Sequence, residues 1–532
     1  MPGNLHVDEK KSILIFCVVL LVQCFVIIAW GTQKERMHVD EMFTMEGVKK
    51  EGAGSRYWDL EENFYGTEHN KEEFLERMTV NENDLIIKEG IACVAERLLY
   101  GNFYYVLINL LSSISPGYIP WGICAGFNLL CFLVAQFILY RIVKESFSDT
   151  CALLTTAIYG FSAGGISTVL YARCYMMLIM FEMLLIYVFH RFVKSQKAWQ
   201  RILYIICSEA LAFFLYRTHQ FGMILFLLTT GLAVLFMLIK KKWNLFLWLG
   251  AGYGILCLLG YRIIWDKLKV FFVGGVAPKF YNSLINTPIS WRIAYVKGLF
   301  NIIAEHMFCN AWIMLLTFAV VCYYFIRIKI WRKDSALKEK TVVLGAVIII
   351  VIYGLVLVLG GAIAWRYINP MYPFIAVLLG VTVSIACVDT NISKSAKIVI
   401  LAVAVCIPVI SYGMHRVSEM YTGEETLREE LKAHYHGVNG IMVHHDVRGD
   451  GENWLYEAAT LWPEESNVLV LQHHMILEKG LFECRDADRI LLWLTADFDR
   501  DESISLFKEC TDYKNFELIL NTDHVWVYEC SK

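Results

Sequence analysis

The sequence is poor in charged residues, and this scarcity excludes an ordinary soluble enzyme. Asp, Glu, Lys and Arg make up 19% of its 532 residues, whereas soluble domains carry about 25%. Hydrophobic residues reach 57%, and the mean hydropathy is +0.48. The apolar residues come in blocks of roughly 20, the length of helix that crosses about 30 Å of hydrocarbon. We therefore expect a polytopic membrane protein.

Three further absences narrow the class. No small-x-small cleavage site follows the first apolar run, so we expect a retained first span instead of a signal peptide. There is no internal repeat or low-complexity stretch. The 16 cysteines fit no metal or redox spacing, and most lie inside apolar blocks, where free Cys behaves as a small hydrophobe. Cys93, Cys484, Cys510 and Cys530 are expected outside the membrane and stay unassigned.

The apolar blocks predict a mainly α chain with about 11 transmembrane helices. We expect residues 1–413 to form this transmembrane domain, with a first external loop at 31–119. The expected spans are 12–30, 120–140, 150–169, 175–190, 202–217, 221–239, 243–264, 309–326, 341–360, 370–388 and 396–413.

The orientation follows from Lys and Arg, which cluster in alternate loops. The positive-inside rule makes the basic side cytoplasmic, so we expect an N-terminus inside and a C-terminal segment outside. The loop after Trp30 and residues 265–308 then lie outside as well. The basic clusters are Lys10–Lys11, Arg141–Lys144, Arg191–Arg201, Lys240–Lys242, Arg327–Lys340 and Lys394–Lys397.

One apolar stretch, residues 103–114, is too short to span the membrane. Counting it as a span would move the basic clusters at 191–201 and 240–242 to the outside. We therefore expect a helix in the outer interface, with Tyr100, Tyr104 and Tyr105 at the level of the lipid headgroups.

Residues 414–532 are expected to form a small extracytoplasmic α/β domain. They carry 24 Asp and Glu against 11 Lys and Arg, and short apolar runs alternate with helical patterns. Two His-rich pieces, 444–446 and 473–474, each follow an apolar strand, where ligands of open α/β sheets gather. A metal or ligand site and ordinary loop residues are both open interpretations for them.

Two adjacent carboxylates follow the first span, in the sequence His-Val-Asp-Glu-Met-Phe-Thr at 38–44. In a helix Asp40 and Thr44 share a face, whereas in an extended chain His38 and Asp40 do. Either way Asp40 and Glu41 point apart and should have separate roles. A carboxylate held near the membrane surface can act as general base on a lipid-borne substrate. The alternative is a solvated acidic turn.

Cations follow on the same expected side. Arg173 lies between two apolar blocks, and an Arg at mid-membrane costs roughly 2.5–3.5 kcal/mol, so it should face a polar cavity or an anion. Residues 217–220 (Arg-Thr-His-Gln) form a polar quartet that suits a cavity lining. Arg366 and Tyr367 suit an anionic headgroup, because a guanidinium forms charge-assisted bonds to phosphate. Arg173 could instead snorkel to headgroups, and His219 could be structural.

These motifs, in this order, make the chain resemble the GT-C integral-membrane glycosyltransferases, near the protein O-mannosyltransferase and aminoarabinose-transferase branch. The similarity covers roughly residues 12–415. It is carried by His38, Asp40, Glu41 and Thr44 after the first span, Gly101–Tyr105 through Asn109, Ala172-Arg173-Cys174-Tyr175, Thr218-His219, and Arg366-Tyr367 before downstream prolines.

The resemblance implies a site and a mechanism. A sugar passes with inversion from a polyprenyl-phosphate donor to an acceptor outside the cytoplasm, a glycan, lipid or protein of the bacterial cell envelope. Asp40 is then the general base, with Glu41 beside it. The resemblance assigns binding of the donor phosphate to Arg366, Arg173 and Tyr367. It assigns substrate binding to His38, Tyr104, Tyr105 and His219. Beyond donor and acceptor, we expect membrane lipids and no nucleic acid as partners.

The chain departs from relatives at two places. It has Tyr100-Gly101-Asn102 where relatives often have His-Pro-Pro, and Tyr171 where they often have an acid before Ala-Arg. The second departure removes an acidic ligand. We therefore expect no required cofactor and no metal site, although a divalent cation stays an open alternative.

Two other classes compete with a glycosyltransferase. A transporter or flippase of lipid-linked sugars would share the spans and the outer cations, but it should show polar residues at mid-depth and helix breaks in matched halves. No matched halves are visible in the sequence. A non-catalytic assembly protein of the envelope would need no Asp-Glu pair at the first span exit.

Overall fold

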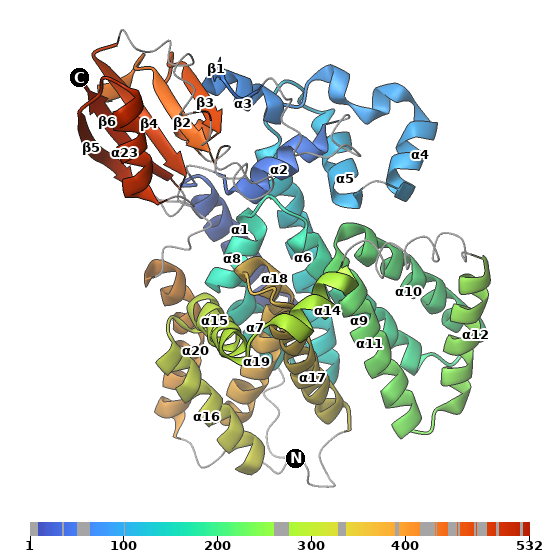
Figure 1. Ribbon diagram of the computed structural model, residues 1–532. Coiled ribbons are helices and arrows are strands. Elements are labelled where there is room, and N and C mark those ends of the chain that lie inside the picture. The colour runs from blue at the N-terminus through green and yellow to red at the C-terminus, as the bar shows by residue number, and fades with distance from the viewer. Residues whose placement is uncertain are drawn as a thin grey trace. The chain divides into compact units, whose positions relative to one another are not determined.

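The computed structural model describes residues 9–34, 37–49, 64–100, 102–259, 276–327, 337–388, 393–414, 431, 433–444, 455, 458–472, 475, 487–495, 499–521 and 525–532. The chain forms two compact units, coloured along the sequence in Figure 1. Unit 1 contains residues 1–32 and 125–417, and unit 2 contains 33–124 and 418–532. Residues 33–124, which include the loop expected outside, thus belong with the C-terminal segment.

The described elements of unit 1 are all helices, which confirms the mainly α expectation for the apolar part of the chain (Figure 1). Its helices are α1 (Glu9–Gly31), α6 (Trp121–Ser146), α7 (Asp149–Gly160), α8 (Ala163–Leu170), α9 (Tyr175–Lys194), α10 (Ala198–Thr218), α11 (Gln220–Ile239), α12 (Trp243–Leu259), α14 (Val276–Asn286), α15 (Ile289–Phe308), α16 (Ala311–Arg327), α17 (Leu337–Gly360), α18 (Trp365–Ile368), η4 (Asn369–Met371), α19 (Tyr372–Val388) and α20 (Lys394–Met414).

Within the described ranges, seven helices are long and apolar enough to cross a membrane, or up to nine if each bent pair counts as one span. The protein is therefore a multi-pass membrane protein. The count of about 11 is not confirmed. The expected span at 243–264 runs beyond the described end of α12, and in α20 only the shorter stretch Lys397–Ile410 is apolar enough.

Two helix breaks differ from the expectation. The expected span at 150–169 is α7 and α8, bent by 59°. The described part of the expected outer loop at 265–308 contains α15, a 20-residue helix that turns by 82° into α16. Arg292, Lys297 and Glu305 dilute its apolar pattern, which is why the sequence did not indicate a span there.

Polar side chains tie three helices of unit 1 together. Gln136 of α6 donates to the side-chain oxygen of Gln23 of α1 at 3.2 Å, and both amides donate to the backbone oxygen of Thr156 of α7. All three residues are buried. In an apolar surrounding such interhelical hydrogen bonds hold neighbouring helices in register.

Unit 2 contains a six-stranded sheet. The strands are β1 (Thr67–His69), β2 (Gly440–His444), β3 (Val468–Gln472), β4 (Arg489–Thr495), β5 (Asn515–Asn521) and β6 (Val525–Ser531), in the order β1-β3-β2-β4-β6-β5. The central strands β3, β2 and β4 are parallel, and the others pair antiparallel. The five C-terminal strands confirm the α/β expectation. The edge strand β1 comes from the first external loop.

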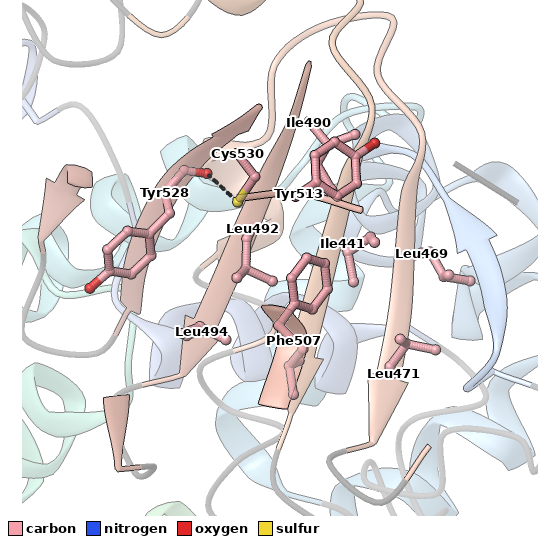
Figure 2. Packing of buried hydrophobic residues seen from close by; sticks show 11 residues of the cluster. Ile441, Leu469, Leu471, Ile490, Leu492, Leu494, Phe507, Tyr513, Tyr528 and Cys530 are labelled. Carbon is pink, nitrogen blue, oxygen red and sulfur yellow. Dashed lines mark hydrogen bonds between the residues drawn. The ribbon is translucent and has the colours of Figure 1, made fainter. Parts of the chain in front are cut away.

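The core of this sheet lies under helix α23 (Arg500–Cys510) and the segment that follows it. Figure 2 shows Phe507 and Tyr513 facing the aliphatic side chains of β2, β3 and β4, such as Leu469 and Leu492. The Cys530 thiol is fully buried beside them. Alternate residues of parallel strands thus build one apolar layer, as the short apolar runs predict.

The helical part of unit 2 comprises α2 (Val39–Val48), α3 (Lys71–Met78), η1 (Glu82–Asp84), η2 (Ile86–Glu89), α4 (Ile91–Tyr100) and α5 (Phe103–Ser112). Helix α5 packs against α2 and α4. Tyr104 is fully buried within the protein and is not exposed on its surface. The reason is tertiary packing. A Cβ at Gly47 would lie 2.7 Å from the Tyr105 ring, so the glycine lets α2 and α5 approach closely.

Candidate functional site

The acidic motif forms the start of helix α2, and His38 is its N-cap. The Asp40 amide donates to His38 Nδ1 at 3.0 Å, and the His38 amide donates to Glu41 Oε2 at 2.7 Å. Together the two bonds form a capping box, with His in the place that Ser or Thr usually takes. Because His38 Nδ1 accepts a hydrogen bond, the proton of the neutral ring lies on Nε2.

Glu41 is fully buried, and its carboxylate is paired with Lys34. Lys34 Nζ lies 2.6 Å from Oε1 and 2.7 Å from Oε2, and its side chain is 2% exposed. The ammonium also lies 5.5 Å from the centre of the Trp121 ring. A buried charge needs such a partner, so Glu41 fixes the chain ahead of α2 to the helix.

Asp40 has a different environment from its neighbour. Its side chain is 18% exposed, and Oδ2 lies 3.7 Å from His38 Nδ1. Thr44 donates from Oγ1 to the Asp40 backbone oxygen at 3.1 Å, one turn along the helix. The helical arrangement of the motif is therefore the one present, and Asp40 and Glu41 point apart as expected. Asp40 is the carboxylate that a bound molecule can reach.

Tyr104 and Tyr105 lie in the same unit as the acids. Asn102 caps α5 by accepting from both of their amides. Tyr104 is fully buried, whereas Tyr105 is half-buried against Gly47 of α2, the helix that carries the acidic motif.

The other predicted residues lie in unit 1, where Asn128 of α6 fixes the segment between α8 and α9. Its side-chain amide donates to the backbone oxygens of Val169, Tyr171 and Arg173 at 3.3, 2.8 and 3.2 Å. Asn128 is fully buried. One amide thus holds the short turn that presents Arg173, in a place where an unsatisfied carbonyl would be costly.

The residues predicted in unit 1 converge on Tyr175. The centre of its ring lies 5.2 Å from that of His219 and 6.2 Å from that of Tyr367, and His219 and Tyr367 are 6.1 Å apart. Arg173 lies two residues before Tyr175, and Arg366 immediately precedes Tyr367. Residues from α9, α18 and the α10–α11 junction therefore form one polar and aromatic cluster, here called the Tyr175 cluster.

Several aromatic rings complete the Tyr175 cluster. The Arg366 guanidinium lies 5.1 Å from the Tyr367 ring centre. Tyr353 of α17 donates to the Tyr367 backbone oxygen at 2.9 Å and so fixes the turn that carries both residues. Tyr171 meets Trp365 edge-on at 4.5 Å and stacks on Tyr175 at 6.0 Å. Arginines among aromatic faces suit an anionic group beside a sugar ring.

Arg217, in the last turn of α10, is 9% exposed. Its Nε and Nη2 atoms are buried without a hydrogen-bond partner in the part of the chain that the structure describes. A buried guanidinium without an acceptor is destabilising, so this side chain suits an anion that the protein binds.

Sequence reasoning missed four of these residues as site members. Tyr175 and Arg217 lie inside two of the motifs described above. A polar residue between apolar segments is the signal that could have marked them as site members. Lys34 follows the first span among other charged residues, and it lies seven positions before Glu41. No local pattern marks Asn128. Among the described residues, no three His, Cys, Asp or Glu side chains gather as a metal-ion site. Residues 445–446 and 473–474 lie outside the described ranges.

Comparisons with known proteins place the fold. The family model described as dolichyl-phosphate-mannose-protein mannosyltransferase matches residues 105–221. A comparison with curated proteins finds no match. Two crystal structures of ArnT from Cupriavidus metallidurans are similar over 98% of each chain. The apo structure is 10% identical with a TM-score of 0.50, and the structure bound to undecaprenyl phosphate is 11% identical with a TM-score of 0.51.

A third structure, the apo oligosaccharyltransferase of Archaeoglobus fulgidus, is 11% identical with a TM-score of 0.44, over 86% of this chain and 60% of that one. The expected resemblance to the GT-C glycosyltransferases is confirmed by the family model and, at full length, by the ArnT fold.

Proposed function

We propose that the protein is an inverting glycosyltransferase that takes a hexosyl or pentosyl group from a polyprenyl-phosphate donor. The acceptor is a glycan, lipid or protein outside the cytoplasm. The observation that carries the proposal is the Tyr175 cluster, which gathers Arg173, His219, Arg366 and Tyr367 around one phenol. The ArnT structure with bound undecaprenyl phosphate supports a donor of the same chemical class.

In the proposed reaction, Asp40 accepts the proton of the acceptor hydroxyl while that oxygen attacks the anomeric carbon. The bond from the anomeric carbon to the phosphate oxygen breaks, and polyprenyl phosphate leaves from the opposite face. Its charge is stabilised by Arg366 and Arg173, with the Tyr367 phenol as a further donor. The phosphate leaves as a stable anion, so no general acid is required.

The remaining residues are assigned by their environments. Glu41, paired with Lys34, positions α2 and therefore the Asp40 backbone. His38 caps the same helix, and its Nε2 edge is proposed to contact the sugar or acceptor. His219 and Tyr105 are proposed to contact the substrate, and Tyr104 is proposed to support Tyr105 within unit 2. The proposed reaction uses no metal ion, because a carboxylate and guanidinium groups supply the base and the phosphate ligands.

The experiment that tests this function uses purified protein in lipid nanodiscs with polyprenyl-phosphate sugars. The expected result is release of polyprenyl phosphate when an envelope-derived acceptor fraction is added, and loss of that release in Arg366→Ala. Arg201→Ala is the matched control and should keep the release. Arg201 lies near the start of α10, where it contacts Asn244, whereas His219 of the Tyr175 cluster follows the other end of that helix. Movement of intact lipid-linked sugar across vesicles without release would instead establish the transporter.

We further propose that the N-terminus lies in the cytoplasm and unit 2 outside, on the basis of the alternating Lys and Arg clusters. Single cysteines introduced at Gly117 and at Lys197, in a background without native cysteines, test this in intact cells. A membrane-impermeant maleimide should label the first site only. Labelling at Lys197 without labelling at Gly117 would reverse the orientation.

A further inference from the structure

Unit 1 contains a cavity of about 630 Å³ away from the Tyr175 cluster. Its walls come from α6, α9, α11, α17 and α19, and most of the residues that line it are aliphatic or aromatic, such as Leu139, Met183, Leu232 and Ile349. A largely apolar cavity of this size is typical of sites for ligands with hydrocarbon parts. None of Arg173, His219, Arg366 and Tyr367 lines it.

Half of the polar side chains in the cavity wall are lysines, and the others are Ser146, Thr229 and His190. Lys194, Lys240 and Lys242 all line the cavity, together with His190. Lys194 is compensated by Glu145, whose Oε2 lies 2.7 Å from Nζ. Lys242 Nζ donates to a backbone oxygen at 3.4 Å. No side-chain partner of Lys240 is present among the described residues. Among the described residues, Glu145 thus pairs with Lys194 from outside the lining, and the wall also carries the ammonium groups of Lys240 and Lys242.

These cations lie far from the proposed donor site. Tyr175 begins α9 and Lys194 ends it. At 1.5 Å per residue, a helix of that length separates its ends by about 28 Å. The lysines belong to the clusters that the positive-inside rule places at the cytoplasmic surface. One molecule's phosphate cannot occupy both places.

We propose that this cavity binds an anionic phospholipid of the cytoplasmic leaflet. Its acyl chain lies between α11 and α17, and its phosphate contacts Lys240 and Lys242. The charge of the wall favours an anionic lipid over a neutral one. An apolar cavity alone would accept any lipid chain, whereas lysines at its wall favour a headgroup with a net negative charge. The inference goes beyond the proposed transfer and does not depend on it.

The first test is native mass spectrometry of the full-length protein in detergent, titrated with phosphatidylglycerol or phosphatidylcholine. We expect phosphatidylglycerol to be retained preferentially. Lys240→Gln and Lys242→Gln should each weaken it about five-fold, since a lysine near an anionic surface contributes about 1 kcal/mol and 1.4 kcal/mol is ten-fold. Lys241→Gln removes the same charge from a residue that does not line the cavity, and should change nothing.

The second test fills the cavity. A Cβ at Gly345 meets no atom within 4 Å, and Gly345 lines the cavity, so Gly345→Leu should displace the acyl chain without a clash. Gly231→Leu is the matched control, equally open but outside the lining. Equal retention of both phospholipids, or full retention in Gly345→Leu, would overturn the proposal. So would Lys240-dependent retention of polyprenyl phosphate with no retention of phosphatidylglycerol.

Discussion

The pairing of Glu41 with Lys34 makes a quantitative prediction about unit 2. Both side chains are almost fully buried, and the two ion-pair distances are 2.6 and 2.7 Å. Removing one partner of a buried pair leaves an uncompensated charge and costs about 3–5 kcal/mol. Glu41→Ala also removes the acceptor of the His38 amide, a capping interaction worth about 0.5–2 kcal/mol. We expect a loss of roughly 4–6 kcal/mol in the free energy of unfolding.

A double-mutant cycle separates the pair from the cap. Glu41→Gln keeps an oxygen for the His38 amide but loses the charge, and Lys34→Met removes the cation while keeping its apolar stem. Each single variant should cost about 3 kcal/mol or more, whereas the double variant should recover most of that loss because neither charge stays buried alone. The coupling should persist in high salt, since buried pairs are weakly screened.

The assay is proteolysis of the full-length protein in detergent at increasing urea concentration, which follows the population of the opened unit. Cleavage should begin at clearly lower urea in each single variant than in the wild type or the double variant. Glu96→Gln, at an exposed side chain of α4, is the control and should behave as the wild type. Wild-type resistance in both Glu41→Gln and Lys34→Met would refute the structural role of the pair.

Three further predictions follow from single contacts. Asn109→Ala should destabilise unit 2 by about 1–3 kcal/mol, measured by the same proteolysis, because its side chain makes three hydrogen bonds to backbone groups. Asn128→Ala should weaken donor binding, measured by titration, while the protein stays folded, because Asn128 holds the turn that presents Arg173. Burial raises the pKa of the Cys530 thiol to about 12, so it should resist a maleimide at pH 8 until urea is added, whereas half-buried Cys510 should react.

The raised pKa of the Cys530 thiol also predicts how the stability of unit 2 depends on pH. A thiol whose pKa is raised on folding contributes stability below its unfolded pKa, and that contribution is lost as the pH rises toward about 12. Unit 2 should therefore lose urea resistance at strongly alkaline pH, and Cys530→Ala should remove part of that loss. Unchanged alkaline behaviour in Cys530→Ala would contradict this reasoning.

The parts of the fold that the sequence could predict are those with a strong local pattern. The strands after residue 440 have short apolar runs between charged turns, and the structure places β2 to β6 there. The motif at 38–44 was compatible with a helical and with an extended conformation. The structure has the helix, with His38 as its N-cap. The order of the five motifs along the chain also predicted the GT-C fold. Each motif alone is weak, but five in the same order as in the family are more specific.

What the sequence could not predict depends on contacts between distant segments. The pairing of β1 with β3 joins residues 67–69 to 468–470, and no local pattern indicates this. The burial of Tyr104 follows from the packing of α5 on α2, which overrides its interfacial composition. Helix α15 was missed because its charged residues break the apolar run. Arg217 was recognised as polar, but its unsatisfied guanidinium is visible only in three dimensions.

The most direct test of the proposed function is the turnover of Asp40→Asn with a polyprenyl-phosphate sugar in nanodiscs. General-base catalysis is worth about 10²–10⁴-fold, so the transfer rate should fall by that factor while donor affinity and urea resistance stay at wild-type values. Glu96→Gln, at an exposed side chain of α4, should retain its rate. Arg366→Lys should instead lose donor affinity, since a point charge does not replace a planar guanidinium. Near-normal transfer by Asp40→Asn would contradict the account.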